Sequence, residues 1–114
     1  MMKYISAAII ALLLCGCASM AQKGALVRAY KNYEKRDYED VISLVAMSES
    51  YKTPTPELKS ELAYLKAIAL EKLGRKDEAQ GIFLYLTEQF PDSEYAYRAK
   101  EKLKSPASTS DQHR

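Results

Sequence analysis

Cysteine and histidine are the first side chains to consider as nucleophiles or metal ligands in this sequence. The chain has two cysteines, Cys15 and Cys17, in the stretch LLLCGC, and one histidine, His113, beside the last residue. A disulfide between Cys15 and Cys17 would close a loop too tight for ordinary disulfide geometry. A metal site would need further ligands, and His113 lies almost a hundred residues away. The cysteine pair therefore predicts neither a disulfide nor a metal site.

Carboxylates supply no better candidates for catalysis. Glu57 and Glu61, and likewise Asp77 and Glu78, have spacings that are typical of solvated helix faces. The glycines are isolated, so the sequence has no glycine-rich phosphate-binding loop. Nucleophilic catalysis would also need a positioned base, and His113 lies in a polar C-terminal tail. We expect no catalytic residues, no metal and no cofactor, and hence a protein that is not an enzyme.

The N-terminal segment has the pattern of an export signal. Residues 5–15 form an unbroken run of apolar and small residues, which follows a single positive charge at Lys3. The run is too short to span the roughly 30 Å hydrocarbon core of a bilayer as a permanent helix. A basic start, an apolar run of this length and a small-residue end are typical of a signal sequence.

The remainder of the chain is nearly neutral. Of the 17 Lys and Arg residues only Lys3 precedes Cys17, so 16 remain against 15 Asp and Glu. These charges are interspersed along the chain, whereas nucleic-acid binding favours a clustered basic face. We expect no nucleic-acid partner.

The segment Leu14-Cys15-Gly16-Cys17 resembles the lipobox of bacterial lipoproteins, with Cys15 as a less common small residue in the second slot. The resemblance implies that residues 1–16 are a cleaved signal peptide. It also implies that Cys17 becomes the first residue of the mature protein and carries covalent lipid, with no other cofactor. Three acyl chains would hold a protein at a membrane effectively permanently, whereas one holds it only marginally. A plain secretory signal that is cleaved elsewhere is the alternative.

The residues after the modified cysteine indicate which membrane holds the protein and how far its folded domain can lie from that membrane. Ala18 and Ser19 follow it, with no aspartate in the slot that retains enterobacterial lipoproteins in the inner membrane. By the same resemblance this implies the outer membrane, facing the periplasm, if the host is Gram-negative. Residues 17–23 are expected to be the lipidated cysteine and a tether, whose six residues after Cys17 reach about 20 Å when extended.

From residue 24 to residue 104 the pattern is helical throughout, and Gly and Pro occur only as punctuation. Thr55 is a candidate N-cap before Pro56 at a first helical position, and Gly74 is a natural stop. The tail 105–114 has nothing to bury and is expected to be disordered. The predicted helices cover residues 24–35, 38–51, 56–73, 76–89 and 93–104.

The helical segment repeats at a shift of 38 residues, which pairs Ala29 with Ala67, Val41 with Ala79 and Val45 with Phe83. With Ala67, Leu70, Gly74, Ala79, Phe83 and Pro91 at the family's positions, the second unit resembles a tetratricopeptide repeat (TPR). The first unit is degenerate, with Arg36 where the family has glycine. The resemblance implies an all-α fold of two TPR-like helical hairpins and a C-terminal helix, forming one domain over 24–104 after a lipoprotein signal peptide.

Two repeats are few for an independently stable solenoid, because each unit buries its face against the next. We therefore expect marginal stability, or support from a partner or from self-association.

In TPR proteins the first helix of each hairpin lines a concave groove, and the resemblance carries this role to twelve positions. Tyrosine offers large contact area with few rotors, and arginine favours carboxylates. The alternative for any one tyrosine is that it packs between helices. The implied partner-binding groove comprises Leu26, Tyr30, Tyr33, Glu34, Glu61, Tyr64, Ile68, Glu71, Lys72, Tyr95, Arg98 and Lys102.

These features together favour a lipoprotein of the outer membrane that acts as an adaptor in a periplasmic machine. β-Barrel assembly, a secretion or pilus system and cell-wall coordination are the candidate processes, and the partner is a protein or peptide. The alternative is an inhibitor or immunity-type lipoprotein that masks a periplasmic toxin or enzyme. The sequence favours no single partner or process, because TPR folds are scaffolds for many functions.

Overall fold

The computed structural model describes residues 2–112, and of these the side chains of residues 4–13 and 16–104. Over residues 2–112 the chain is helical, with no strand, so the prediction of an all-α fold is confirmed. The helices are α1 (Met2–Glu34), α2 (Tyr38–Tyr51), α3 (Pro56–Lys72), α4 (Lys76–Gln89) and α5 (Glu94–Gln112).

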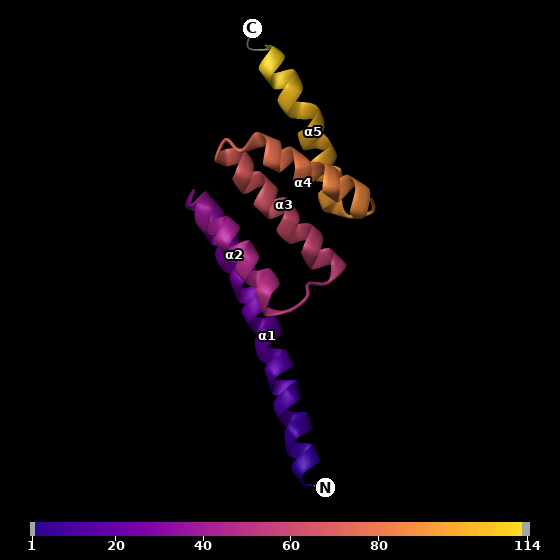
Figure 1. Ribbon diagram of the computed structural model, residues 1–114. Helices are drawn as coiled ribbons and strands as arrows, with labels where there is room; N and C mark the ends of the chain where they lie inside the picture. Colours follow the sequence, from indigo (N-terminus) through magenta and orange to yellow (C-terminus); the bar gives the residue numbers. More distant parts are fainter. Residues whose placement is uncertain (1, 113–114) are drawn as a thin grey trace.

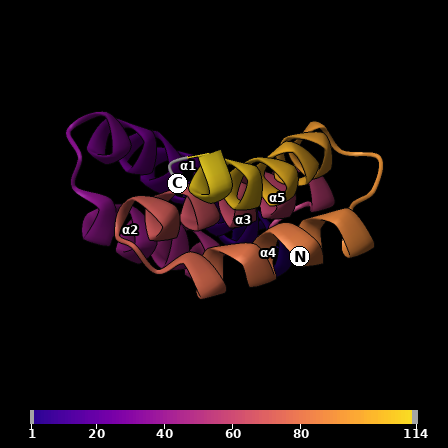
Figure 2. The same cartoon turned by 90° about the horizontal axis from the view of Figure 1, so that it is seen from above.

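Consecutive helices pack against each other as antiparallel neighbours, and α3 also contacts both α1 and α5 (Figure 1). Seen from above, α1 and α5 lie on one side of the molecule, α2 and α4 lie on the other, and α3 runs between them (Figure 2). The side chains that α1, α3 and α5 direct away from α2 and α4 therefore share one surface.

Local chemistry fixes where the later helices begin. Thr55 is the N-cap of α3, because its Oγ1 accepts a hydrogen bond of 3.2 Å from the N–H of Leu58, and Pro56 is the first helical residue. Ser93 is the N-cap of α5, because its Oγ accepts a hydrogen bond of 3.0 Å from the N–H of Ala96. Since Ser93 is the cap, α5 begins at Glu94, one residue after the predicted start.

The turn between α1 and α2 has the same geometry as the turn between α3 and α4, 38 residues later. Arg36 has φ of 67° and Gly74 has φ of 79°, so both occupy the left-handed region. Paired backbone hydrogen bonds close both turns, from Arg36 to Tyr33 and Asp37 to Asn32 in the first and from Gly74 to Glu71 and Arg75 to Leu70 in the second, at 2.8–3.1 Å.

The core consists of two clusters of buried side chains, joined where Ile42 and Ile68 pack against both. The small residues Ala29, Ala67 and Ala79 are fully buried, which lets neighbouring helices approach closely. The first cluster contains Ala29, Val41, Leu44, Val45, Leu62, Leu65 and Ala69, and the second contains Ala67, Leu70, Ala79, Phe83, Leu86 and Ala99.

The prediction of an extended tether over residues 18–23 was wrong, because α1 is continuous through this segment. Gln22 is buried between α1 and α2, where its Nε2 donates to the carbonyls of Ser48 (3.1 Å) and Lys52 (2.6 Å). Ser48 Oγ returns a hydrogen bond of 2.9 Å to the Gln22 carbonyl. These contacts hold the segment helical, so the domain begins before residue 24.

At the other end, α5 continues to Gln112, past the predicted boundary at residue 104 and over most of the segment predicted to be a disordered tail. Among the described side chains, the last that packs on the core is Leu103. Residues 113–114, including His113, lie outside the described residues.

The N-terminal half of α1 projects from the domain and gives the molecule its long dimension, in overall extents of 75 × 30 × 17 Å (Figure 1). Its described side chains up to Cys17, such as Ile9 and Leu12, are exposed. Part of α1 is apolar over 18 residues, long enough to cross a membrane. Length alone therefore does not exclude a membrane span, although a signal sequence has the same property.

Candidate functional site

Several of the predicted groove residues meet on the surface shared by α1, α3 and α5. We call this surface the α1–α3–α5 face and define it by Tyr30, Glu61, Tyr64, Glu71, Tyr95, Arg98 and Lys102. Each of the three helices contributes side chains, because α3 contacts both of the others. The face therefore assembles residues that are up to 72 positions apart in the chain, Tyr30 and Lys102 being the extremes.

Tyr30 and Glu61 tie α1 to α3 at one end of the face. The Tyr30 hydroxyl, on a side chain that is 38% exposed, donates a hydrogen bond of 2.6 Å to Glu61 Oε2. Burial raises the pKa of Tyr30 well above its ordinary value of 10.0, and the hydrogen bond to Glu61 raises it further. Burial and then the charge of Glu61 also raise the pKa of Tyr95. Both hydroxyls therefore keep their protons to a higher pH than a solvated tyrosine does.

An aromatic cluster occupies the middle of the face. The ring centroids of Tyr64 and Tyr95 lie 5.6 Å apart, and those of Tyr64 and the buried Phe83 lie 6.0 Å apart. The Arg98 guanidinium lies 6.0 Å from the centre of the Tyr64 ring and 5.5 Å from that of Tyr95. Arg98 also pairs with Glu94 at 3.2 Å, one turn earlier on α5. The cluster thus places a cation among aromatic rings at the surface.

An ion pair closes the other end, where Lys102 Nζ lies 2.9 Å from Glu71 Oε1. Burial alone would lower the pKa of Lys102, but the hydrogen bond and charge of Glu71 outweigh it, and the pKa is raised. Beside this pair is an open pocket of about 330 Å³, lined by Tyr64, Arg98, Glu101 and Lys102. Glu101 was missed in the sequence, although it follows Arg98 by three residues on the same helix face.

The other predicted groove residues have different surroundings. Leu26, Tyr33 and Ile68 are partly buried and pack against the first core cluster, and the Tyr33 ring meets that of Tyr38 edge-on at 5.3 Å. These three contribute more to packing than to a free surface. Glu34 and Lys72 are exposed at the C-terminal ends of α1 and α3.

Cys17 is a free, exposed thiol on α1, at the base of the projecting segment. The side chain of Cys15 lies outside those described. Within the described side chains, no group of three or more His, Cys, Asp or Glu residues is arranged to hold a metal ion.

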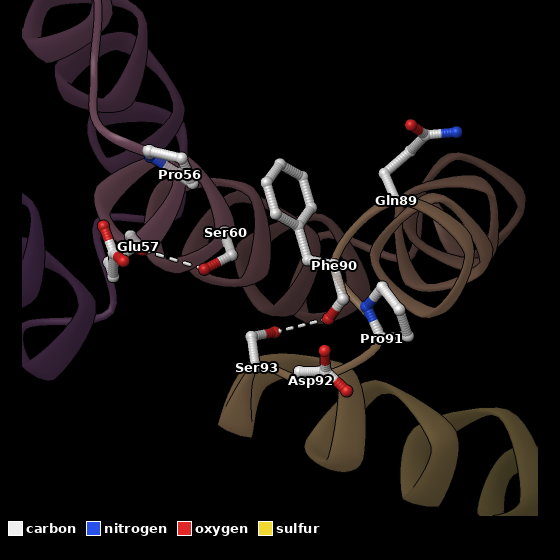
Figure 3. Close-up of a pocket in the computed structure, with 8 residues that line it drawn as sticks. All are labelled: Pro56, Glu57, Ser60, Gln89, Phe90, Pro91, Asp92 and Ser93. Carbon is white, nitrogen blue, oxygen red and sulfur yellow. Dashed lines mark hydrogen bonds between the residues drawn. The ribbon is translucent and has the colours of Figure 1, made fainter.

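A second open pocket, of about 350 Å³, lies between the start of α3 and the α4–α5 turn (Figure 3). The Phe90 ring projects from that turn toward α3. Ser60 Oγ donates to the carbonyl of Glu57, and Ser93 Oγ donates to the carbonyl of Phe90, in each case three residues earlier in the chain. The two helix starts that border the pocket are already capped by Thr55 and Ser93. The hydroxyls here serve local structure, and none of the predicted groove residues lines the pocket.

The α1–α3–α5 face carries side chains that can bind a ligand. It offers half-buried tyrosine rings and paired charges, which suit a peptide or a helix of another protein. Comparison of the chain with protein-family models, with curated proteins and with solved structures gave no match.

Proposed function

We propose that the protein is a lipid-anchored adaptor of the bacterial cell envelope, in which two TPR-like hairpins and a final helix present a partner-binding face. The observation that carries the proposal is the convergence of Tyr30, Glu61, Tyr64, Tyr95 and Arg98 from three helices on one surface. Aromatic and arginine side chains supply a large share of the binding energy in protein interfaces.

The TPR-like part of the proposal is supported by the two equivalent turns. Arg36 and Gly74, 38 residues apart, share the left-handed conformation and the same backbone hydrogen bonds. The residues at the family's small and aromatic positions, Ala67, Ala79 and Phe83, are buried together in the second cluster. The first helices of the two hairpins, α1 and α3, contact each other, as neighbouring repeats in a solenoid do.

The anchor is supported by the position of Cys17. Its thiol is exposed, and the described apolar side chains that precede it, such as Ile9 and Leu12, are exposed as well. In a host with two membranes, the lipobox resemblance and the absence of aspartate after Cys17 favour the outer membrane, facing the periplasm. An adaptor there would bring a protein partner to an envelope machine such as β-barrel assembly, secretion or cell-wall coordination.

Metabolic labelling with a fatty-acid analogue tests the anchor. We expect label on the wild-type protein and on the Cys15→Ser variant, which keeps the acceptor thiol, but none on Cys17→Ser. Label that persists on Cys17→Ser would contradict lipidation at this residue.

Affinity purification from envelope membranes tests the adaptor. We expect Tyr64→Ala combined with Arg98→Glu to lose the proteins that copurify with wild type, because these changes remove the centre of the α1–α3–α5 face. Tyr85→Ala, on the opposite helix α4, is the matched control and should retain them. Loss with Tyr85→Ala alone would contradict the proposed face, and a single tight partner without an envelope defect on deletion would favour the inhibitor instead.

A further inference from the structure

The base of the folded domain, where α1 leaves it, carries an exposed group of mixed character. Met20 on α1 is 76% exposed, Tyr51 at the end of α2 is 41% exposed, and Lys52 follows it in the loop to α3. We call Met20, Tyr51 and Lys52 the collar. The α2–α3 connection is the part of the folded domain nearest the projecting apolar half of α1 (Figure 1).

The collar is fixed to α1 by hydrogen bonds. Gln22 Nε2 donates to the Lys52 carbonyl at 2.6 Å, and Lys52 Nζ donates to Ser19 Oγ at 3.1 Å. Ser19 is two residues after Cys17, and α1 is helical across this interval. With a rise of 1.5 Å per residue, Ser19 lies about 3 Å along the helix axis from Cys17, and the Lys52 ammonium is within hydrogen-bonding distance of Ser19.

From this spacing we infer that the collar rests in the headgroup layer of the bilayer that holds the N-terminal anchor. The inference rests on the proposed anchor. A lipid on Cys17 would place that residue at the boundary of the hydrocarbon, and the headgroup region beyond it is roughly 6 Å thick in each leaflet. Side chains within one helical turn of Cys17 must then share the layer with phosphates.

The collar has the chemistry that this layer favours. A lysine ammonium attracts lipid phosphate, tyrosine is enriched at membrane interfaces, and an exposed methionine gains from contact with acyl chains. The nearby charges in the sequence are mixed, Lys23 being basic and Glu49 and Glu57 acidic, and Lys52 is the cation that bonds to Ser19, two residues after Cys17. Because Lys52 bonds to Ser19, two residues after the lipid attachment site at Cys17, the bilayer itself is the surface that covers the collar. The domain is therefore held at the membrane without slack.

The chain contains no tryptophan, so a single indole reports on one position. The full chain, purified from membranes as Tyr51→Trp, is reconstituted in vesicles of phosphatidylcholine and phosphatidylglycerol whose acyl chains are brominated near the headgroup. We expect the indole emission to shift to the blue and to lose most of its intensity. Tyr85→Trp is the matched control, since Tyr85 is similarly exposed at 36% but lies on α4, and it should be unaffected.

A charge reversal sharpens the test. Lys52→Glu, added to Tyr51→Trp, should weaken the quenching several-fold, whereas Lys76→Glu at the start of α4 should not. Equal emission of Tyr51→Trp and Tyr85→Trp, whether both are quenched or both are bright, would overturn the inference. Fatty-acid labelling of the same preparations reports separately on the anchor. Unlabelled protein in which Tyr51→Trp is still quenched would refute lipidation and leave the collar in place, and labelled protein without quenching would refute the collar alone.

Discussion

Tyr30 and Glu61 are the pair that gives the α1–α3–α5 face its chemical character. A tyrosine that donates to a carboxylate keeps its proton, because ionisation would set two negative charges side by side. The same surroundings make the pair sensitive to alkali. The folded state holds the proton of Tyr30 at a higher pH than the unfolded chain does, and the same is true of Tyr33, Tyr95 and Lys102.

Alkaline unfolding tests this residue-scale account. Stability should be constant up to the ordinary tyrosine pKa of 10.0 and fall above it, since the unfolded state there binds fewer protons than the folded state. Tyr30→Phe should cost about 1 kcal/mol at neutral pH through the lost hydrogen bond, and should lose less stability above pH 10.0 than wild type. Urea unfolding across this pH range makes the measurement. Tyr97→Phe, at an exposed site on α5, is the control, and an equal alkaline loss in wild type and Tyr30→Phe would refute the account.

At the scale of the elements, the sequence predicted the bounds of α2 and α4 and nearly those of α3, because their limits are set locally. Thr55, Pro56 and Gly74 act on residues within one turn of themselves. The helical course of residues 18–23 was not predictable in this way. Gln22 donates to carbonyls 26 and 30 residues away in the chain. A polar residue that was predicted to lie in the tether is therefore part of the α1–α2 interface.

The two turns offer a matched test of equivalent geometry. Arg36→Gly should stabilise the protein by about 1 kcal/mol, because a side chain is unfavourable in the left-handed region that Arg36 occupies. Gly74→Ala should destabilise it by about the same amount, although nothing lies within 4 Å of the added Cβ. Thermal or urea unfolding of both variants gives the two signs. The same sign in both would show that the turns are not equivalent.

Hydrogen exchange tests the extension of α1 into the domain. Gln22→Ala removes the bonds to Ser48 and Lys52, so we expect a loss of about 1–2 kcal/mol and faster amide exchange over residues 17–22. Lys23→Ala changes the exposed neighbour and should leave both unchanged. Exchange over 17–22 that is already fast in wild type would contradict a helix held against α2.

At the scale of the whole molecule, Ile42 and Ile68 pack against both core clusters, so we expect the two clusters to unfold as one cooperative unit. The burial of Ala67 and Phe83 agrees with the packing roles that the TPR resemblance implied for these positions. The sequence did not show which of the predicted groove tyrosines pack and which remain accessible, because that depends on how α1 and α5 lie against α3. Tyr33 packs on Tyr38, whereas Tyr30 reaches across to Glu61.

Urea unfolding of the chain without residues 1–16 tests this cooperativity. We expect one transition at a low midpoint, the same by circular dichroism and by tyrosine fluorescence. Ile68→Ala should lower the stability by about 2 kcal/mol and separate the two signals, because it weakens the junction between the clusters. Ile82→Ala, at a residue that packs only on the second cluster, should lower stability while the signals stay together. Separate transitions in wild type would contradict a single unit.

The central claim, that an anchored domain binds its partner through the α1–α3–α5 face, is tested most directly by photocrosslinking in living cells. A photoreactive amino acid is placed at Tyr64 on the face and, in a second strain, at Tyr85 on α4. The account predicts a discrete crosslinked product from position 64, lost when Arg98→Glu is added, and none from position 85. Products from position 85 alone would contradict it.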